Sequence, residues 1–265
     1  MPDIAFNRAR FLNICYEASL AAHSRFNIGT YKEKKLHLIL KSYFEPSERC
    51  REVPHGGYIA DILNADGITE IQTSGFANMR DKLEAFLPDM PVTLVFPIAA
   101  RKYVSWIDPE SGEISRRSPS PKKGKPFDAV PEMVFIRPYL NDPHLTVRAV
   151  LLEIDEYRML DGRRSLSRKR GSSRYERIPT DICGIYDFHG AGDFLALLPY
   201  EPGEVVTAHA LADAARFRGR DVSAMTRVLQ DVGAMERCGK DGNAILYRIG
   251  GDAGKNPAQL LKTDA

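Results

Sequence analysis

Residues 56–75 read Gly-Gly-Tyr-Ile-Ala-Asp-Ile-Leu-Asn-Ala-Asp-Gly-Ile-Thr-Glu-Ile-Gln-Thr-Ser-Gly, and the rest of the expected fold is built around them. Two short runs of alternating apolar residues flank the pair Asp66-Gly67. An Asp-Gly pair between such runs is typical of a tight β-hairpin, because glycine adopts the backbone conformations that the turn requires. The stretch therefore predicts two antiparallel strands joined at Asp66-Gly67.

Acidic and amide side chains share one face of this expected hairpin. With a two-residue loop at the Asp-Gly pair, Asp61 lies opposite Gln72, and Leu63 lies opposite Glu70. Side chains alternate between the two faces of a strand, so these four side chains project on the same side. A four-residue loop keeps this grouping, whereas a three-residue loop destroys it.

The shared face offers oxygen atoms from Asp61, Glu70 and Gln72. Carboxylate and carboxamide oxygens are the ligands of hard divalent cations such as Mg²⁺ and Mn²⁺, so the face is a candidate metal site. The alternative interpretation is the solvated face of an ordinary hairpin, on which acidic residues promote solubility.

Three further elements are expected around the hairpin. An amphipathic pattern predicts a helix over residues 31–44. Residues 78–87 are expected to form a second helix that ends at Pro88. Residues 92–98 are an almost continuous apolar run, which is typical of a buried strand. The expected order is helix, hairpin, helix, strand.

This order resembles the PD-(D/E)XK nuclease superfamily over about residues 28–108. The positions that match the motif of that family are Glu33, Asp61, Glu70 and Gln72. The resemblance implies an α/β fold with a restriction-endonuclease-like mixed sheet flanked by helices. It also implies that Asp61 and Glu70 hold Mg²⁺ or Mn²⁺, that Glu33 assists, and that the site hydrolyses phosphodiester bonds.

Two positions depart from the family pattern. Gln72 stands where the family has a Lys that activates the attacking water, and an amide has no useful basicity. Water activation would then depend on the metal, with Gln72 orienting the water. Ala60 replaces the Pro of the family name, at a position that the family keeps loosely.

Three basic side chains are further candidates for phosphate steering or proton transfer. Glu33, His37 and Lys41 are spaced four residues apart, so they share one face of the expected helix. His55 precedes the glycine pair of the hairpin stretch. The alternative is a solvated helix face with incidental ion pairs, and a loop position for His55.

Length and composition set limits on the class of protein. A chain of 265 residues with 43% hydrophobic and 27% charged residues predicts a globular protein of one or two domains. No apolar run reaches the ~18 residues of a membrane helix, and no secretion signal is recognised. The four cysteines are far apart in the sequence, so a reducing cytoplasm is the expected compartment.

The net charge of +2 is small, but the basic residues are clustered. One cluster lies within residues 115–125, and a second within residues 163–177 contains Arg168, Lys169 and Arg170. Such clusters suit the phosphates of nucleic acid, because affinity comes mostly from neutralised phosphates and released counterions. The alternative is that both clusters are solvated loops.

Residues 192–249 change to a helical pattern followed by a second hairpin. Thr207 is expected to cap one helix, Asp221 the next, and Gly233 to end it. This arrangement resembles the winged helix-turn-helix family, which implies a helix in the major groove of DNA and a wing along the backbone. The residues that the resemblance assigns to DNA are Arg220, Ser223, Thr226, Arg227 and Lys240. Alternatively, such a domain binds protein or only dimerises.

The expected organisation has four parts: a nuclease-like domain (1–112), a basic middle segment with short strands (113–185), a winged-helix domain (186–249) and a flexible tail (250–265). The expected function is metal-dependent endonucleolytic cleavage of double-stranded DNA, without membrane association. A non-catalytic DNA-binding transcriptional regulator with a degenerate nuclease fold is the alternative. RNA as the partner and a homodimeric state stay open.

Overall fold

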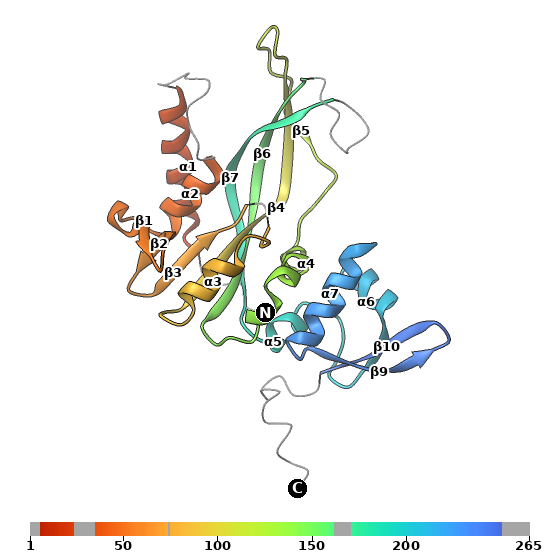
Figure 1. Ribbon diagram of the computed structural model, residues 1–265. Coiled ribbons are helices and arrows are strands. Elements are labelled where there is room, and N and C mark those ends of the chain that lie inside the picture. The colour runs from red at the N-terminus through yellow and green to blue at the C-terminus, as the bar shows by residue number, and fades with distance from the viewer. Residues whose placement is uncertain (1–5, 24–34, 74, 162–170, 251–265) are drawn as a thin grey trace.

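The computed structural model describes residues 6–23, 35–73, 75–161 and 171–250. It is an α/β protein in which a mixed seven-stranded sheet is flanked by helices (Figure 1). The strand order is β1-β2-β3-β4-β6-β7, with β5 paired to β4. The bounds are β1 (Arg51–His55), β2 (Tyr58–Asn64), β3 (Gly67–Ile71), β4 (Val92–Ile107), β5 (Ser118–Pro119), β6 (Leu145–Met159) and β7 (Ser173–Phe188).

The centre of the sheet is parallel and its flanks are antiparallel. β3 pairs with β4, and β4 with β6, in parallel, while β1, β2 and β7 join by antiparallel ladders. Parallel central strands are usually buried on both faces, which explains the continuous apolar run at the start of β4. β4, β6 and β7 are long, and their upper halves extend past the end of β3 (Figure 1).

Two hydrophobic cores cover the two faces of the sheet. On one face, α1 (Arg8–His23) and α2 (Lys35–Phe44) bury Phe11 and Leu40 against Val95 and Leu152. On the other face, α3 (Arg80–Phe86) and α4 (Val130–Met133) pack over Leu94 within a larger cluster. The shorter 3-10 helices are η1 (Glu48–Cys50), η2 (Pro126–Ala129) and η3 (Val134–Tyr139).

The predicted hairpin exists as β2 and β3, but its loop lies one residue earlier than expected. Asn64 pairs with Gly67, so the two loop residues are Ala65 and Asp66, and Gly67 is the first residue of β3. The backbone N–H of Asp66 donates to Asn64 Oδ1 at 3.0 Å and closes the turn. The expected pairing therefore shifts by two residues along the ladder, which leaves every side chain on its expected face.

Gly67 is required for a reason that the sequence does not reveal. Its φ is +124°, and a Cβ atom at this position would lie 2.3 Å from the carbonyl oxygen of Pro91. The close approach lets the N–H of Ile68 donate to that same oxygen at 2.9 Å. The glycine thus marks the contact between β3 and the chain that enters β4, and not the turn itself.

Several expected elements differ in extent. Residues 92–98, expected to form a buried strand, are the first part of the longer strand β4, which has an irregularity between Ala99 and Arg101. Residues 113–185 were expected to hold short strands, but β6 and β7 are 15 and 16 residues long and continue the sheet. Each gains its length from pairing with a long neighbour, which is a tertiary effect.

The C-terminal part contains a second sheet of three strands in the order β8-β10-β9. Its elements are α5 (Ala191–Leu195), β8 (Val205–Thr207), α6 (Ala208–Ala214), α7 (Arg220–Asp231), β9 (Met235–Asp241) and β10 (Ala244–Ile249). Thr207 caps α6 as predicted, since its side chain accepts from the N–H of Ala210 at 3.1 Å. The expected Asp221 cap is wrong: α7 begins earlier, with Gly219 at the N-cap and a φ of +61°.

This C-terminal part packs directly on the large sheet's helical layer. Arg137 in η3 forms an ion pair with Asp231 of α7, in which Nη2 donates to Oδ1 at 2.8 Å. The rings of Phe127 and Phe217 stack with centroids 5.8 Å apart. The hydrophobic cluster of α3 and α4 continues through this contact into α6 and α7.

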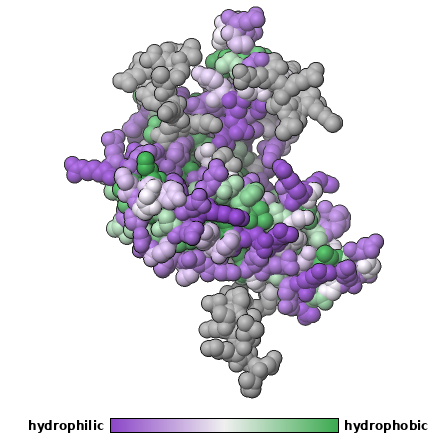
Figure 2. Space-filling model, viewed as in Figure 1, coloured by the Kyte–Doolittle hydropathy of each residue, from purple (hydrophilic) through white to green (hydrophobic). Residues whose placement is uncertain are grey.

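The viewed face of the molecule is mostly hydrophilic, with small hydrophobic areas between the polar ones (Figure 2). None of the helices in the described ranges has the length and apolar character needed to cross a membrane. All four cysteines lie within these ranges, and each is a free thiol.

Candidate functional site

Two acidic side chains meet where β2 and β3 separate. The ladder between these strands ends at the pair of Ile62 and Thr69. Immediately beyond it, Asp61 Oδ2 accepts a hydrogen bond from the N–H of Ile71 at 2.8 Å. The N–H of Asp61 in turn donates to Glu70 Oε1 at 3.2 Å. The two carboxylates thus replace backbone pairing at this point and hold the ends of both strands.

Glu70 is buried and paired with a lysine from α3. Its side chain is only 1% exposed, and its Oε2 accepts from Lys82 Nζ at 2.8 Å. Lys82 Nζ also donates to the carbonyl oxygen of Ile59 at 2.8 Å, which fixes the ammonium group beside β2. A carboxylate this deeply buried requires such a partner, because its desolvation is otherwise very costly. The burial of Glu70 is inconsistent with a merely solvated hairpin face.

Asp61 has a partner from the opposite side of the sheet. His37 of α2 lies with its Nε2 3.0 Å from Asp61 Oδ2. α2 and α3 cover different faces, so the separation of β2 and β3 lets side chains from both faces approach one site. The site consists of Asp61, Glu70, His37 and Lys82, and it is called the acid site below.

Burial and charge shift the two carboxylates in opposite directions. Burial opposes ionisation of Asp61, but the hydrogen bond and charge of His37, with help from the N–H of Ile71, outweigh it and hold its pKa below the ordinary value. For Glu70, burial and the neighbouring Asp61 raise the pKa, and Lys82 offsets only part of this effect. At the same site, Asp61 is therefore the stronger acid and Glu70 the weaker one.

These shifts predict opposite contributions to stability as the pH changes. Ionised Asp61 stabilises the fold above its ordinary pKa of about 4, and this contribution is lost as the pH falls through its lowered pKa. Ionised Glu70 costs stability, and the cost develops as the pH rises from its ordinary pKa of about 4.3 to its raised pKa. We expect the destabilisation by Asp61→Asn to shrink in acid, and Glu70→Gln to become relatively more favourable as the pH rises.

The measurement is the free energy of unfolding in urea for the wild type and both variants, between about pH 3 and pH 7. Asp66→Asn is the matched control, because Asp66 is exposed in the loop of the same hairpin. Differences from wild type that stay constant with pH for both variants would show that neither carboxylate has a shifted pKa.

The other residues expected at this site have different placements. Gln72 follows β3, and its N–H donates to the carbonyl oxygen of Val95 at 2.8 Å, so its backbone is tied to β4. Lys41 is buried and pairs with Glu52. His55 is the last residue of β1, before the turn into β2, and its Nε2 lies 3.1 Å from Asp89 Oδ2. Glu33 lies outside the described residues.

Lys82 is the site residue that sequence reasoning missed. The sequence predicted a helix over residues 78–87, of which Arg80–Phe86 are helical, but gave Lys82 no role, since lysines on helices are usually solvated. The available signal was Glu70 itself: a carboxylate between Ile68 and Ile71, on a strand that is apolar on both faces, needs a cation from another element.

The arrangement of possible metal ligands is a further property of the chain. Within the part of the chain that the structure describes, no group of three or more His, Cys, Asp or Glu side chains is arranged to hold a metal ion. The acid site itself brings two carboxylates together.

The residues expected to contact DNA have three different placements. Four of them are exposed, on α7 or β9: Arg220, Ser223, Arg227 and Lys240. Thr226 is a correction, because it is only 7% exposed and its hydroxyl donates to the carbonyl oxygen of Ser223 at 3.2 Å. It belongs to the packed side of the helix. Arg168, Lys169 and Arg170 lie outside the described residues.

The fold and the acid site define an α/β protein whose mixed sheet separates around a buried, charge-paired acid pair. Residues 34–189 match a family described as a domain of unknown function, DUF8091, and the chain belongs to this family. A protein from Treponema pallidum (strain Nichols), described as uncharacterized, is 29% identical over 222 residues, which cover 83% of this chain and 87% of that protein. No solved structure matches the chain.

Proposed function

We propose that this chain is a metal-dependent endonuclease of the PD-(D/E)XK type that hydrolyses phosphodiester bonds in DNA. The observation that carries the proposal is the placement of Asp61 and Glu70, which hydrogen-bond each other's strands where β2 and β3 separate. The order α2, β1, β2, β3, α3, β4 supports it, since helix, hairpin, helix and strand follow one another as in that superfamily.

The donor atoms fit a hard divalent cation. Mg²⁺ is commonly bound through one or two carboxylates while it keeps several waters and contacts substrate phosphates. We assign Mg²⁺ or Mn²⁺ to Asp61 and Glu70. When bound, such an ion lowers the pKa of a water and stabilises negative charge on the phosphate.

The chain's own residues orient this pair. Lys82 holds Glu70 from α3, and His37 holds Asp61 from α2. In the proposed site Gln72 orients a water by hydrogen bonding, but its amide cannot accept a proton. Glu33 is proposed to assist, on the strength of its sequence position alone.

The C-terminal part is proposed to be a winged helix-turn-helix that grips the duplex. Its exposed residues on α7 and β9 supply the contacts: Ser223 and Arg227 toward bases, and Arg220 and Lys240 toward phosphates. Arg168, Lys169 and Arg170 are proposed as additional phosphate contacts from the sequence. RNA is the second candidate substrate, since basic residues do not distinguish it from DNA.

One observation favours a second function, a non-catalytic DNA-binding transcriptional regulator. Both oxygens of Glu70 already accept hydrogen bonds, from the N–H of Asp61 and from Lys82. A site that is satisfied in this way stabilises the fold without a metal. Gln72 in the position of the family's Lys points in the same direction.

Isothermal titration of Mg²⁺ and Mn²⁺ decides between the two functions. We expect the wild type to bind metal and to nick plasmid DNA, and we expect EDTA to abolish the nicking. An Asp61→Ala/Glu70→Ala variant should lose both properties, because both proposed ligands are gone. Gel shifts on the same samples measure DNA binding. A wild type that shifts DNA, but neither binds metal nor nicks DNA, would support the regulator function.

A further inference from the structure

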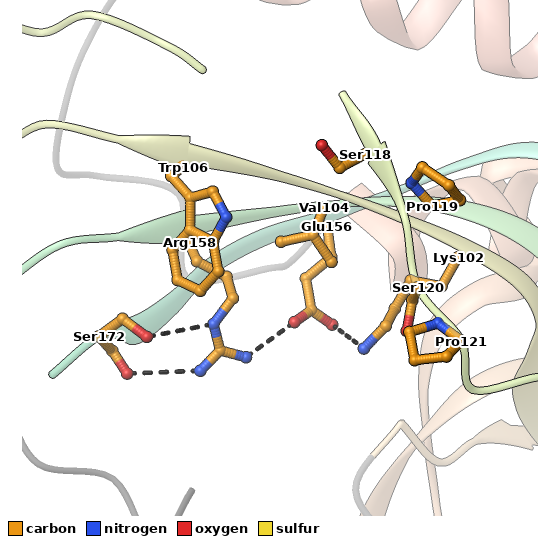
Figure 3. A pocket seen from close by; sticks show the side chains of 10 residues that line it. All are labelled: Lys102, Val104, Trp106, Ser118, Pro119, Ser120, Pro121, Glu156, Arg158 and Ser172. Carbon is orange, nitrogen blue, oxygen red and sulfur yellow. Dashed lines mark hydrogen bonds and ion pairs between the residues drawn. The ribbon is translucent and has the colours of Figure 1, made fainter. Parts of the chain in front are cut away.

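A pocket lies on the upper half of the long strands, outside the acid site (Figure 3). It has a volume of about 390 Å³ and is formed by β4, β6, the segment around β5 and Ser172, the residue before β7. The residues that matter for its chemistry are Lys102, Trp106, Ser118, Ser120, Glu156 and Arg158. Pockets of this size hold small ligands or single units of a polymer.

The register of the sheet brings these side chains together. Lys102 and Trp106 are four residues apart on β4, so they lie on the same face. Their neighbours on β6 are Ile154 and Arg158, respectively. Glu156 lies between the latter two, so it projects from that face as well. Leu152 and Ile154, on the same face of β6, belong to the hydrophobic cluster under α1 and α2, and the pocket residues of β6 follow them along the strand.

Glu156 holds the cations of the pocket in place. Its side chain is only 2% exposed, and its two oxygens lie 3.2 Å from Lys102 Nζ and 2.9 Å from Arg158 Nη1. Arg174 Nε lies 3.7 Å from the same carboxylate. This burial excludes a merely solvated position for Glu156. Three cations therefore surround one carboxylate, and the cluster keeps excess positive charge.

Arg177, which lies opposite Glu156 in the ladder of β6 and β7, also has fewer acceptors than donors. Among the described residues, Arg177 Nε is a buried donor without an acceptor. Burial and the charge of Arg174 lower the pKa of Arg177. Arg177 Nη2 also donates to the carbonyl oxygen of Thr73 at 3.1 Å. Thr73 follows Glu70 by three residues in the chain, so this arginine ties the start of β7 to the segment after β3.

An aromatic ring stands beside the cations. Trp106 is partly exposed, and the guanidinium of Arg158 lies 5.8 Å from its ring centroid. Figure 3 shows Arg158 held below the ring by Ser172 and Glu156, which leaves the guanidinium in a fixed position. An indole ring next to fixed cations is the combination that binds an unpaired base and its phosphate.

We propose that this pocket binds one nucleotide of a single-stranded nucleic acid, with the base against Trp106 and the phosphate against Lys102 and Arg158. The base must be unpaired, because a paired base has no free face for the ring. The inference rests on the proposed function, which it deepens: it assigns a single-stranded segment to the substrate.

The chain contains a single tryptophan, so its fluorescence reports on this pocket directly. We expect a short oligothymidylate, added in EDTA, to quench the emission with saturation, and a duplex of equal length to leave it unchanged. Lys102→Ala and Arg158→Gln should each weaken the affinity by about tenfold and flatten its salt dependence. Arg49→Ala is the control, since Arg49 is exposed on η1.

Trp106→Ala and Trp106→Phe, followed by anisotropy of a labelled strand, test the stacking separately. We expect Ala to weaken binding by at least about tenfold and Phe to retain most of it, since any aromatic face stacks on a base. Circular dichroism establishes that each variant is folded. Equal quenching by inorganic phosphate, or a labelled strand that binds without quenching, overturns the proposal.

The same assay separates this inference from the proposed nuclease activity. Asp61→Asn should bind the strand as the wild type does, because Asp61 is outside the pocket. Cleavage without quenching would contradict the proposed nucleotide binding in the pocket but would support the nuclease activity. Quenching without cleavage would support the pocket as a strand-binding site but would contradict the proposed nuclease activity. Oligouridylate in place of oligothymidylate shows whether RNA or DNA is preferred.

Discussion

The Asp61→Asn protein is expected to lose metal-dependent DNA cleavage by at least about 100-fold, in line with the loss of a group that stabilises transition-state charge. The substitution is nearly isosteric, and asparagine keeps an oxygen that accepts from the N–H of Ile71. What disappears is the negative charge, and with it the proposed metal ligand and the ion pair with His37.

The measurement is the initial rate of plasmid nicking at saturating Mg²⁺ and again at saturating Mn²⁺. Asp66→Asn makes the same chemical change on an exposed residue of the same hairpin and should nick at the wild-type rate. A retained rate in Asp61→Asn, with metal binding intact, would exclude Asp61 as a ligand. A matching loss in Asp66→Asn would assign the effect to the stability of the hairpin.

The Lys82→Met protein is expected to be less stable than wild type by about 2 kcal/mol at neutral pH. Removing one partner of a buried ion pair typically costs ~3–5 kcal/mol, and the partial exposure of Lys82 reduces that figure here. Methionine retains most of the apolar stem of lysine, so the change is mainly one of charge. The remaining carboxylate of Glu70 is 1% exposed and already has a raised pKa.

A double-mutant cycle with Glu70→Gln isolates this pair. In Lys82→Met/Glu70→Gln no buried charge is left at this position, so we expect most of the lost stability to return. Lys123→Met, at an exposed position, is the control and should change the unfolding free energy little. Additive effects in the cycle would mean that the two side chains do not interact in solution.

The two predictions test different properties of one site. Asp61→Asn tests chemistry, whereas Lys82→Met tests whether the buried charge of Glu70 depends on a cation from α3. If Lys82→Met lowers the stability as expected but Asp61→Asn does not lower DNA cleavage, the acid site only stabilises the separation of β2 and β3. The regulator alternative requires this result.

The sequence predicted the elements that have strong local signals. The apolar alternation in residues 58–71 is a local property of strands, so the β2–β3 hairpin and the faces of Asp61 and Glu70 followed from it. The same holds for α3, for the capping of α6 by Thr207, and for the final hairpin of β9 and β10. In these cases the residues that specify the structure are close together in the chain.

Local signals were misleading where a distant contact decided the structure. The Asp66-Gly67 pair suggested the turn, but Gly67 is needed because β3 approaches Pro91 closely. The length of β7 was missed because its first residues, 173–177, are mostly polar and basic, and they form a strand through the long ladder with β6.

Charge pairing is the clearest case of what only tertiary structure decided. The sequence by itself determined an α/β chain, with two acidic residues on one face of a hairpin and basic residues in clusters. It could not determine that Glu70 is buried against Lys82, or that Glu156 is buried among cations from β4, β6 and β7. A carboxylate has the same hydrophilic pattern whether it faces water or a cation. Only the packing of distant elements removes the water and supplies the partner.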